Sequence, residues 1–458
     1  MGGANDYVGP VMQAVADYTA EALTRDLPEE VARKGCHHLL DSLAAIVSGS
    51  ALKPGRAAIA YVEQMGGVEE ASVAGTRLVL PAVNAALANG MLAHADETDD
   101  SHEPGFFHPG CAVVPAALAM AERHGRSGAD LLKAVVLGYD IGARFNLALE
   151  PRDFYARGFS SHAFGGLFGA SAAAFALAGL TSAQVRQGFS FTAQQASGLA
   201  TWVRDEEHIE KAFDFAGMPA RNAVASATMM TAGFTGAADV FSGDRNLFAT
   251  YAPEPDVDLM ARGLGADFEI MRANIKKWSV GSPIQAALDA VEYLLANESF
   301  AAGQIQAVNV RLPDREAHIV DGRTMPDVNL QFLVSAFLVR GAMDFKTSHD
   351  YALMADPDIA AMQEKVTLLP DAELSAAVPR RQGIVELNLQ DGRTLTRRTR
   401  AVRGTADNPM SDAEVEAKAL DLVSDVLGDS IAAALVARID DIAALGDVRD
   451  LRPLLQPA

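Results

Sequence analysis

The chain has 458 residues, more than a single hydrophobic core usually holds, so two domains are expected. Hydrophobic residues make up 49% and charged residues 21%, an ordinary globular composition that argues against a disordered or fibrous protein. The formal net charge of −21 argues against nucleic acid or an anionic membrane surface as a partner, because both require a concentrated positive field.

Cysteine content and the apolar segments predict the compartment. Cys36 and Cys111 are far apart and in no metal-ligand spacing, which indicates a reducing compartment without a disulfide framework. Residues 1–18 show no secretory signal pattern. Residues 163–180 are apolar but rich in Ala and Gly, which is more typical of a buried helix than of a membrane span of about 20 strongly apolar residues. We therefore predict a cytoplasmic protein.

Residues 10–245 are predicted to be almost entirely helical, because apolar residues recur at three- and four-residue spacing. Asp26-Leu27-Pro28 predicts one helix start, and Ser127 and Ser182 are predicted to precede two later helices. The many Ala and Gly residues let helix backbones approach closely, so a compact bundle is expected. Helical spacing is found at 11–23, 28–48, 83–94, 113–124 and 128–143.

A change of pattern near residue 270 predicts a second domain. Residues 304–312, 384–389 and 394–402 alternate apolar and polar side chains as half-buried strands do, and Asp391-Gly392-Arg393 predicts a hairpin turn. Helices at 284–296 and 328–339 are expected to cover one face. The predicted fold is mainly α: a large all-helical domain over 1–269, with 405–458 packing back onto it, and an inserted, smaller α+β lid domain over 270–404.

The densest polar segment runs from His94 to Gly110 and holds five carboxylates and three histidines within the fifteen residues 94–108. Three interpretations compete. The segment is an exposed acidic loop, a divalent metal site, or an acid/base site in which crowded carboxylates and histidines titrate near neutrality. No established metal-binding motif is present.

The motifs resemble those of a known family. His94-x-x-Glu-x-Asp-Asp-Ser is followed by His108-Pro-Gly, then by Gly138-Tyr-Asp-x-x-x-Arg144, and Asn408-Pro-Met closes the series. Together they resemble the MmgE/PrpD family, which includes 2-methylcitrate dehydratase, cis-aconitate decarboxylase and iminodisuccinate epimerase. The resemblance implies a metal-free, cofactor-independent homodimer that binds a small di- or tricarboxylate. It also implies a proton transfer at a carbon beside a carboxylate, at a site between the helical domain and the lid.

The resemblance assigns candidate residues unevenly. Glu97, Ser101 and His108 match the family's site positions well. The histidine expected after Gly158-Phe159 is Ser160, with His162 as a substitute two residues later, and the expected lysine is Lys211.

The predicted lid departs most from the pattern. Gln285 stands where a histidine is expected, Gly281 where a cysteine is, and Ala336 where a tyrosine is. Glutamine cannot transfer protons near neutral pH, so an altered substrate or reaction is expected.

Cationic residues near the motifs are predicted to bind substrate carboxylates, since charge-assisted bonds hold such anions. Of the adjacent Lys276 and Lys277, Lys276 is the one assigned. The remaining predicted substrate-binding residues are Arg157, Arg204, His208 and Arg221, together with Ser101, Ser160 and Gln285.

The predicted reaction is a hydro-lyase step. His108 or Lys211 removes a proton α to a carboxylate, and Glu97 or His162 protonates the leaving hydroxyl. Epimerisation and decarboxylation on a similar substrate are alternatives. A metallohydrolase and a non-catalytic carboxylate-binding homologue are the alternatives from other classes.

Overall fold

The computed structural model describes residues 7–457, which fall into two compact units. The first comprises residues up to Ala95, Asp99–Ala273 and Val415 onward, and the second comprises Asp96–Thr98 and Asn274–Glu414. The change of sequence pattern predicts divisions at 269/270 and 404/405. The grouping of the three residues Asp96–Thr98 with the second unit was not predicted. The chain has a mainly α fold, as predicted.

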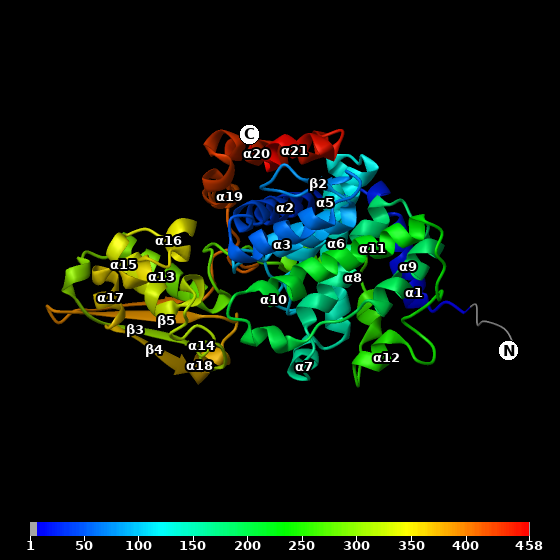
Figure 1. Cartoon of the computed structure of the whole chain (residues 1–458). Coiled ribbons are helices and arrows are strands. Elements are labelled where there is room, and N and C mark those ends of the chain that lie inside the picture. The colour runs from blue at the N-terminus through cyan, green and yellow to red at the C-terminus, as the bar shows by residue number, and fades with distance from the viewer. Residues whose placement is uncertain (1–6, 458) are drawn as a thin grey trace. The chain divides into compact units, whose positions relative to one another are not determined.

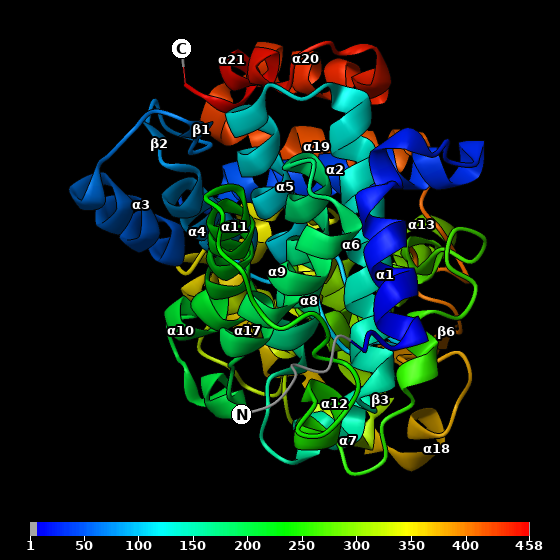
Figure 2. The same cartoon turned by 90° about the vertical axis from the view of Figure 1, so that its right-hand side faces the viewer.

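The first unit is a helical bundle around the wholly buried helix α8 (Figures 1 and 2). Two two-residue strands, β1 (Ala71–Ser72) and β2 (Val79–Leu80), pair antiparallel beside it. Its helices up to residue 251 are α1 (Pro10–Ala20), α2 (Glu29–Gly49), α3 (Lys53–Met65), α4 (Ala82–Ala93), α5 (Gly110–His124), α6 (Gly128–Ala148), α7 (Pro151–Ala156), α8 (Ser161–Leu177), α9 (Ser182–Gln194), α10 (Ile209–Ala212), α11 (Met218–Thr231) and α12 (Leu247–Tyr251).

Glycines explain how α6 and α8 pack so closely. A Cβ on Gly142 would lie 2.6 Å from the carbonyl oxygen of Gly165, and one on Gly169 would collide with the carbonyl oxygen of Gly138. Because only glycine fits at these positions, backbone meets backbone along the crossing. Every residue of α8 is buried, which agrees with the buried helix predicted for 163–180. Among the described residues, no helix combines the length and apolarity that crossing a bilayer requires.

The C-terminal helices of the first unit lie across one end of its bundle (red in Figures 1 and 2). Two ion pairs hold them there: the buried Lys418 Nζ is 2.5 Å from Asp41 Oδ1, and the partly exposed Arg452 donates to the buried Glu122 carboxylate at 2.8 Å. The helices are α19 (Asp412–Leu427), whose first residues group with the second unit, α20 (Asp429–Asp440) and α21 (Arg452–Leu455).

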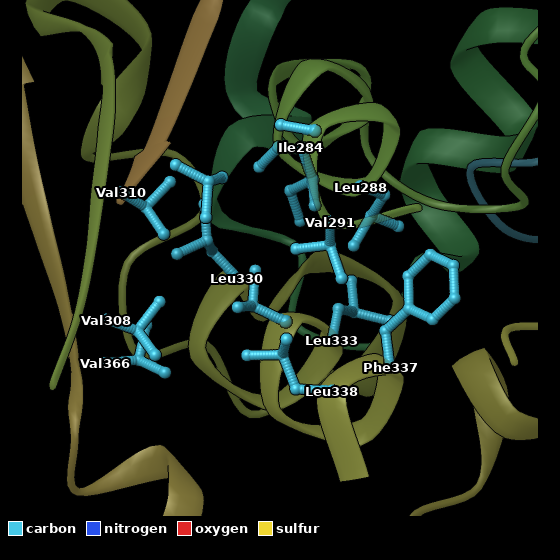
Figure 3. Close-up of a cluster of buried hydrophobic side chains, with 14 of the residues drawn as sticks. Ile284, Leu288, Val291, Val308, Val310, Leu330, Leu333, Phe337, Leu338 and Val366 are labelled. Carbon is cyan, nitrogen blue, oxygen red and sulfur yellow. The ribbon is translucent and has the colours of Figure 1, made fainter. Parts of the chain in front are cut away.

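The second unit is a four-stranded sheet with helices on one face. The strand order is β4-β3-β5-β6, with β4 parallel to β3 and the other neighbours antiparallel. Apolar side chains of α13 and α15 meet Val308, Val310 and Val366 of the sheet (Figure 3). Its elements are β3 (Ile305–Pro313), β4 (Val366–Asp371), β5 (Gly383–Leu389), β6 (Thr394–Thr399), α13 (Gln285–Asn297), α14 (Asp314–Ala317), α15 (Leu330–Arg340), α16 (Phe345–His349), α17 (Pro357–Gln363) and α18 (Ala372–Ser375).

Local details correct three predictions. Thr181, not Ser182, is the N-cap of α9, because its side chain and that of Gln184 form a reciprocal capping box. Helix α2 begins at Glu29 with Pro28 at the N-cap and no side-chain cap, so Asp26 does not start it. Strand β4 was not predicted, because Leu368-Leu369-Pro370 interrupts any alternation. The capping box at Ser127 and the β5–β6 hairpin agree with the sequence.

Candidate active site

A cluster of buried histidines in the first unit surrounds one carboxylate. His94 ends α4, and its Nδ1 lies 2.9 Å from Asp99 Oδ2. His108, just before α5, places its own Nδ1 3.2 Å from the same oxygen. Burial alone would raise the pKa of Asp99, but the two imidazoles outweigh it and hold that pKa well below its usual range.

An aromatic ring holds the planes of two imidazoles in this cluster. Phe215 stacks on His162 with 3.7 Å between ring centroids and on His94 with 4.4 Å. Phe215 belongs to a π-helical turn, Phe213–Gly217, between α10 and α11. Such turns are frequent at functional sites because they insert a residue into a regular helix. Here the turn brings Phe215 between two histidines of other elements.

His162 differs electrically from its neighbours. It lies in the first turn of α8, is 8% exposed, and its Nδ1 has no hydrogen-bond partner. Burial lowers the pKa of His162 well below its usual value, and the nearby cationic groups His108, His94 and Lys211 lower it further. His162 is therefore neutral near pH 7. Lys211 Nζ lies 5.1 Å from the centre of the Phe215 ring.

Asp100 fixes the loop that carries Asp99 and His108. Its Oδ2 accepts from Tyr139 at 2.6 Å and contacts His38 Nδ1 at 2.6 Å, and its Oδ1 accepts from Gly110 N at 2.9 Å. Burial lowers the pKa of His38 to about 4, so that this imidazole is neutral. Asp100 is thus a structural member of the Asp-Asp-Ser motif.

Ser160, predicted to bind substrate, is the N-cap of α8. Its Oγ accepts from Ala163 N at 3.3 Å and donates to Asp214 of the π-helical turn. Burial raises the pKa of Asp214 to about 7, although the hydrogen bond from Ser160 opposes this rise. The hydroxyl therefore links α8 to the turn that carries Phe215.

In the second unit, Glu97 pairs with Lys276. Both are at least nine-tenths buried. Lys276 Nζ donates to the Glu97 carbonyl oxygen at 2.8 Å and lies 3.5 Å from Glu97 Oε2. The neighbouring Lys277 instead pairs with Glu292 and covers the Trp278 ring. The structure thus gives the two adjacent lysines different roles.

Gln285 uses its side chain on the backbone. Its Oε1 accepts from Trp278 N at 3.2 Å, and its Nε2 donates to the carbonyl oxygens of Trp278 and Val280 at 2.7 and 3.0 Å. Because of these three bonds, we interpret Gln285 as holding the 278–280 loop, and not as contacting substrate as the sequence predicted.

The other predicted residues lie in varied surroundings. The exposed Arg157 donates to the Tyr251 carbonyl oxygen, and Arg221 donates to the neighbouring Asn222. Arg204 is exposed at the end of a short 3-10 helix, whereas His208 is 4% exposed, with its ring 5.1 Å from that of His94. The last predicted residue, Ser101, is buried in the His94–Gly110 segment.

Sequence comparison agrees with the two units. A family model described as the MmgE/PrpD N-terminal domain matches residues 13–260, and one described as the MmgE/PrpD C-terminal domain matches residues 278–441. The chain belongs to the MmgE/PrpD family. This confirms the resemblance drawn from the His94–Gly110 motif and the motifs that follow it.

Curated MmgE/PrpD relatives match along most of the chain. A cis-aconitate decarboxylase-like protein, oryM, of Aspergillus oryzae is 25% identical and covers 98% of this chain and 97% of its own length. The cis-aconitate decarboxylase of Homo sapiens is 24% identical, covering 94% of this chain and 91% of its own length. That of Aspergillus terreus is 23% identical, covering 97% and 95%. These relatives support an enzyme of lyase type and do not single out dehydration.

Within this MmgE/PrpD chain, one group of the first unit has metal-ligating atoms close together. Ligand atoms of His94, Asp99 and Cys111 lie within 4.8 Å of one another. The Cys111 thiol donates to the His108 carbonyl oxygen at 3.2 Å, so a metal ion bound there would have to displace the thiol proton.

Sequence reasoning missed several residues of these clusters. Asp99 stood in the acidic motif but was not selected over Glu97, and nothing in the local sequence distinguishes Phe215 from other buried phenylalanines. Asp214 lies in the same π-helical turn, three residues after Lys211. A carboxylate next to an assigned lysine was the one available signal for it.

Proposed function

We propose that the chain is a decarboxylase that acts on cis-aconitate or a closely similar unsaturated tricarboxylate. The similarity of nearly the whole chain to cis-aconitate decarboxylases supports this reaction over the hydro-lyase step favoured by the sequence analysis. The observation that carries the chemical assignment is the contact of two imidazoles with one ionised carboxylate, Asp99.

The proposed reaction needs one proton donor. The bond between the leaving carboxylate and the adjacent methylene carbon breaks, and its electron pair becomes a new C=C bond. The original π pair accepts a proton at the far alkene carbon, and CO₂ leaves. One proton is consumed, and the other two carboxylates stay on the product. The site must therefore supply an acid and bind anions.

His108 is the acid that we assign. Its Nδ1 contact with the ionised Asp99 stabilises the imidazolium, whose Nε2–H can be transferred. His162 is neutral because of burial and its cationic neighbours, so we assign it a hydrogen-bonding role instead of proton donation. Such a separation of two histidines by their surroundings is a common way to divide acid and base roles.

Lys211 is the cation of the first unit that we assign to a substrate carboxylate. Its ammonium group lies over aromatic rings next to the histidines. The low local dielectric constant there strengthens its attraction for a substrate carboxylate. Glu97 and Lys276 stay in the proposal on the strength of the family motif. Their buried pairing supports a role for Lys276 in orienting Glu97.

The test is incubation of the full chain with cis-aconitate in D₂O, followed by NMR. We expect CO₂ release and a product that carries one deuterium on the carbon that was protonated. A panel of di- and tricarboxylates run in parallel separates the alternatives. A hydroxy acid that loses water indicates a hydro-lyase, hydrogen exchange alone indicates an epimerase, and binding without any exchange indicates a non-catalytic homologue. Each of the last three results would contradict the proposal.

A further inference from the structure

A buried ionic cluster in the second unit includes a histidine that none of the motifs selects. We call Asp96, Glu97, Lys276, Asp327 and His349 the Asp96 cluster. His349 closes α16, and its side chain is 12% exposed. Its Nε2 lies 2.7 Å from Asp96 Oδ2 and 4.0 Å from Asp327 Oδ2.

Two short contacts of His349 favour its imidazolium form. Its Nδ1 lies 2.9 Å from the Phe345 carbonyl oxygen, which can only accept a hydrogen bond. Its Nε2 lies 2.7 Å from a carboxylate oxygen, which would repel a nitrogen lone pair at that distance. Ser348 Oγ, 3.0 Å from Nδ1, donates its own hydrogen to the same carbonyl oxygen, so an imidazolium with hydrogen on both nitrogens fits these contacts. The Phe345 ring stacks on it at 4.1 Å and fixes its plane.

Asp96 links His349 to the backbone turn that carries Glu97. Its Oδ1 accepts from Thr98 N at 3.0 Å and its Oδ2 accepts from Thr98 Oγ1, so that Asp96–Thr98 forms a tight turn with Glu97 at its centre. Lys276 then contacts both the carbonyl and the carboxylate of Glu97. The imidazolium, the turn and the ammonium thus form one connected path to the Glu97 side chain.

The charges of the cluster explain why the imidazolium is needed. Three carboxylates face two cationic groups within the described residues of the cluster. Burial raises the pKa of Asp327 to about 6, although His349 opposes this rise. Burial alone would lower the pKa of His349, but Asp96 and Asp327 raise it to about 9. Without His349, Asp96 would be a buried carboxylate that lacks its cation.

We propose that His349 is a positioning residue: its imidazolium holds the Asp96–Thr98 turn so that Lys276 can orient the Glu97 carboxylate. The inference rests on the proposed function only in that Glu97 is taken as part of the reacting site. It predicts that loss of the imidazolium affects turnover through Glu97.

The first experiment needs no substrate. NMR titration of the ten histidines, with the His349 signal assigned by its loss in His349→Gln, should show an imidazolium that persists above about pH 8. Asp96→Asn should lower its midpoint by about 1–3 pH units. Hydrogen–deuterium exchange of the peptide containing Asp96–Thr98 should be faster in His349→Gln and unchanged in the control His318→Gln, which alters an exposed histidine of the same unit. A neutral His349 at pH 7, or unchanged exchange, overturns the proposal.

The second experiment is a double-mutant cycle on decarboxylation of cis-aconitate. His349→Gln should lower kcat by up to about 100-fold with little change in KM, as expected when a reacting group is misplaced. In a Glu97→Gln background the same change should have little further effect. A merely structural role would give full additivity, or a lower Tm with unchanged kcat, and either result overturns the proposal. If the wild type releases no CO₂, the proposed function fails, and the titration and exchange experiments still decide the role of His349.

Discussion

His162 of the first unit and His349 of the second are both about nine-tenths buried, yet their pKa values are shifted in opposite directions. Around His162 lie an aromatic ring and cationic groups, and its pKa is well below the usual value. Around His349 lie two carboxylates, and its pKa is raised to about 9. Burial is common to both, so the neighbouring charges decide the protonation state. The first cluster is suited to moving a proton, and the second to holding a charge in place.

The strongest test of this comparison is His108→Gln. If the first cluster carries the acid, kcat should fall by roughly 10²–10⁴-fold, the usual contribution of a positioned acid/base group. The measurement is CO₂ release from cis-aconitate at saturating substrate. His124→Gln, on the exposed last turn of α5, is the matched control and should be unaffected. Near-normal turnover of a folded His108→Gln protein would show that His108 is not the acid.

The aromatic part of the first cluster is tested by Phe215→Ala. Removing the ring between His94 and His162 should lower the free energy of unfolding by about 3–5 kcal/mol, as for other buried phenylalanines, and should also lower kcat. Phe213→Ala, in the same π-helical turn but only partly buried, should cost less. Urea unfolding and turnover measure the two effects. Equal losses for both variants would show that Phe215 has no special position.

The opposite pKa shifts predict opposite pH limits of stability. Because the folded pKa of His349 is raised, its contribution is complete below pH 6.5 and is lost as the pH rises through about 9. That contribution is about 3 kcal/mol. Because the folded pKa of His162 is lowered, its contribution is present above pH 6.5 and is lost as the pH falls below it.

Unfolding free energies measured between pH 5 and pH 10 for the wild type and two variants check this prediction. His349→Gln should flatten the alkaline limb and leave the acid limb, whereas His162→Gln should do the reverse. If both variants change the same limb, the two histidines do not differ in the way that the structure indicates.

The smallest effect is expected for Lys277, which is adjacent to Lys276 in the sequence but does not belong to the Asp96 cluster. Lys277→Met should change the free energy of unfolding by no more than about 1 kcal/mol and leave kcat unchanged, because Lys277 pairs with the half-exposed Glu292. Lys276→Met should lower both stability and kcat, because it leaves Glu97 buried beside other carboxylates. Thermal unfolding and turnover of the two variants make the comparison, and similar behaviour would contradict it.

Much of the fold was predictable from local patterns. The three- and four-residue spacing of apolar side chains located α2, α5 and α6 to within a few residues, and the alternation in β5 and β6 located the hairpin. Strand β4 was not predictable in this way, because a strand that pairs in parallel with β3 is recognised only once β3 is beside it. The grouping of Asp96–Thr98 with residues beyond 273 likewise depends on contacts distant in sequence.

The amino-acid sequence by itself determined the family, the helical character of the chain and the importance of the segment His94–Gly110, because these follow from motif and periodicity. Only the tertiary structure decided what each residue of that segment does. Asp99 joins the histidines, Asp100 anchors the loop, and Asp96 faces His349. The physical reason is that the charge and hydrogen bonding of a buried side chain depend on neighbours from distant parts of the chain. Three of the five carboxylates in this acidic segment therefore have three different sets of partners.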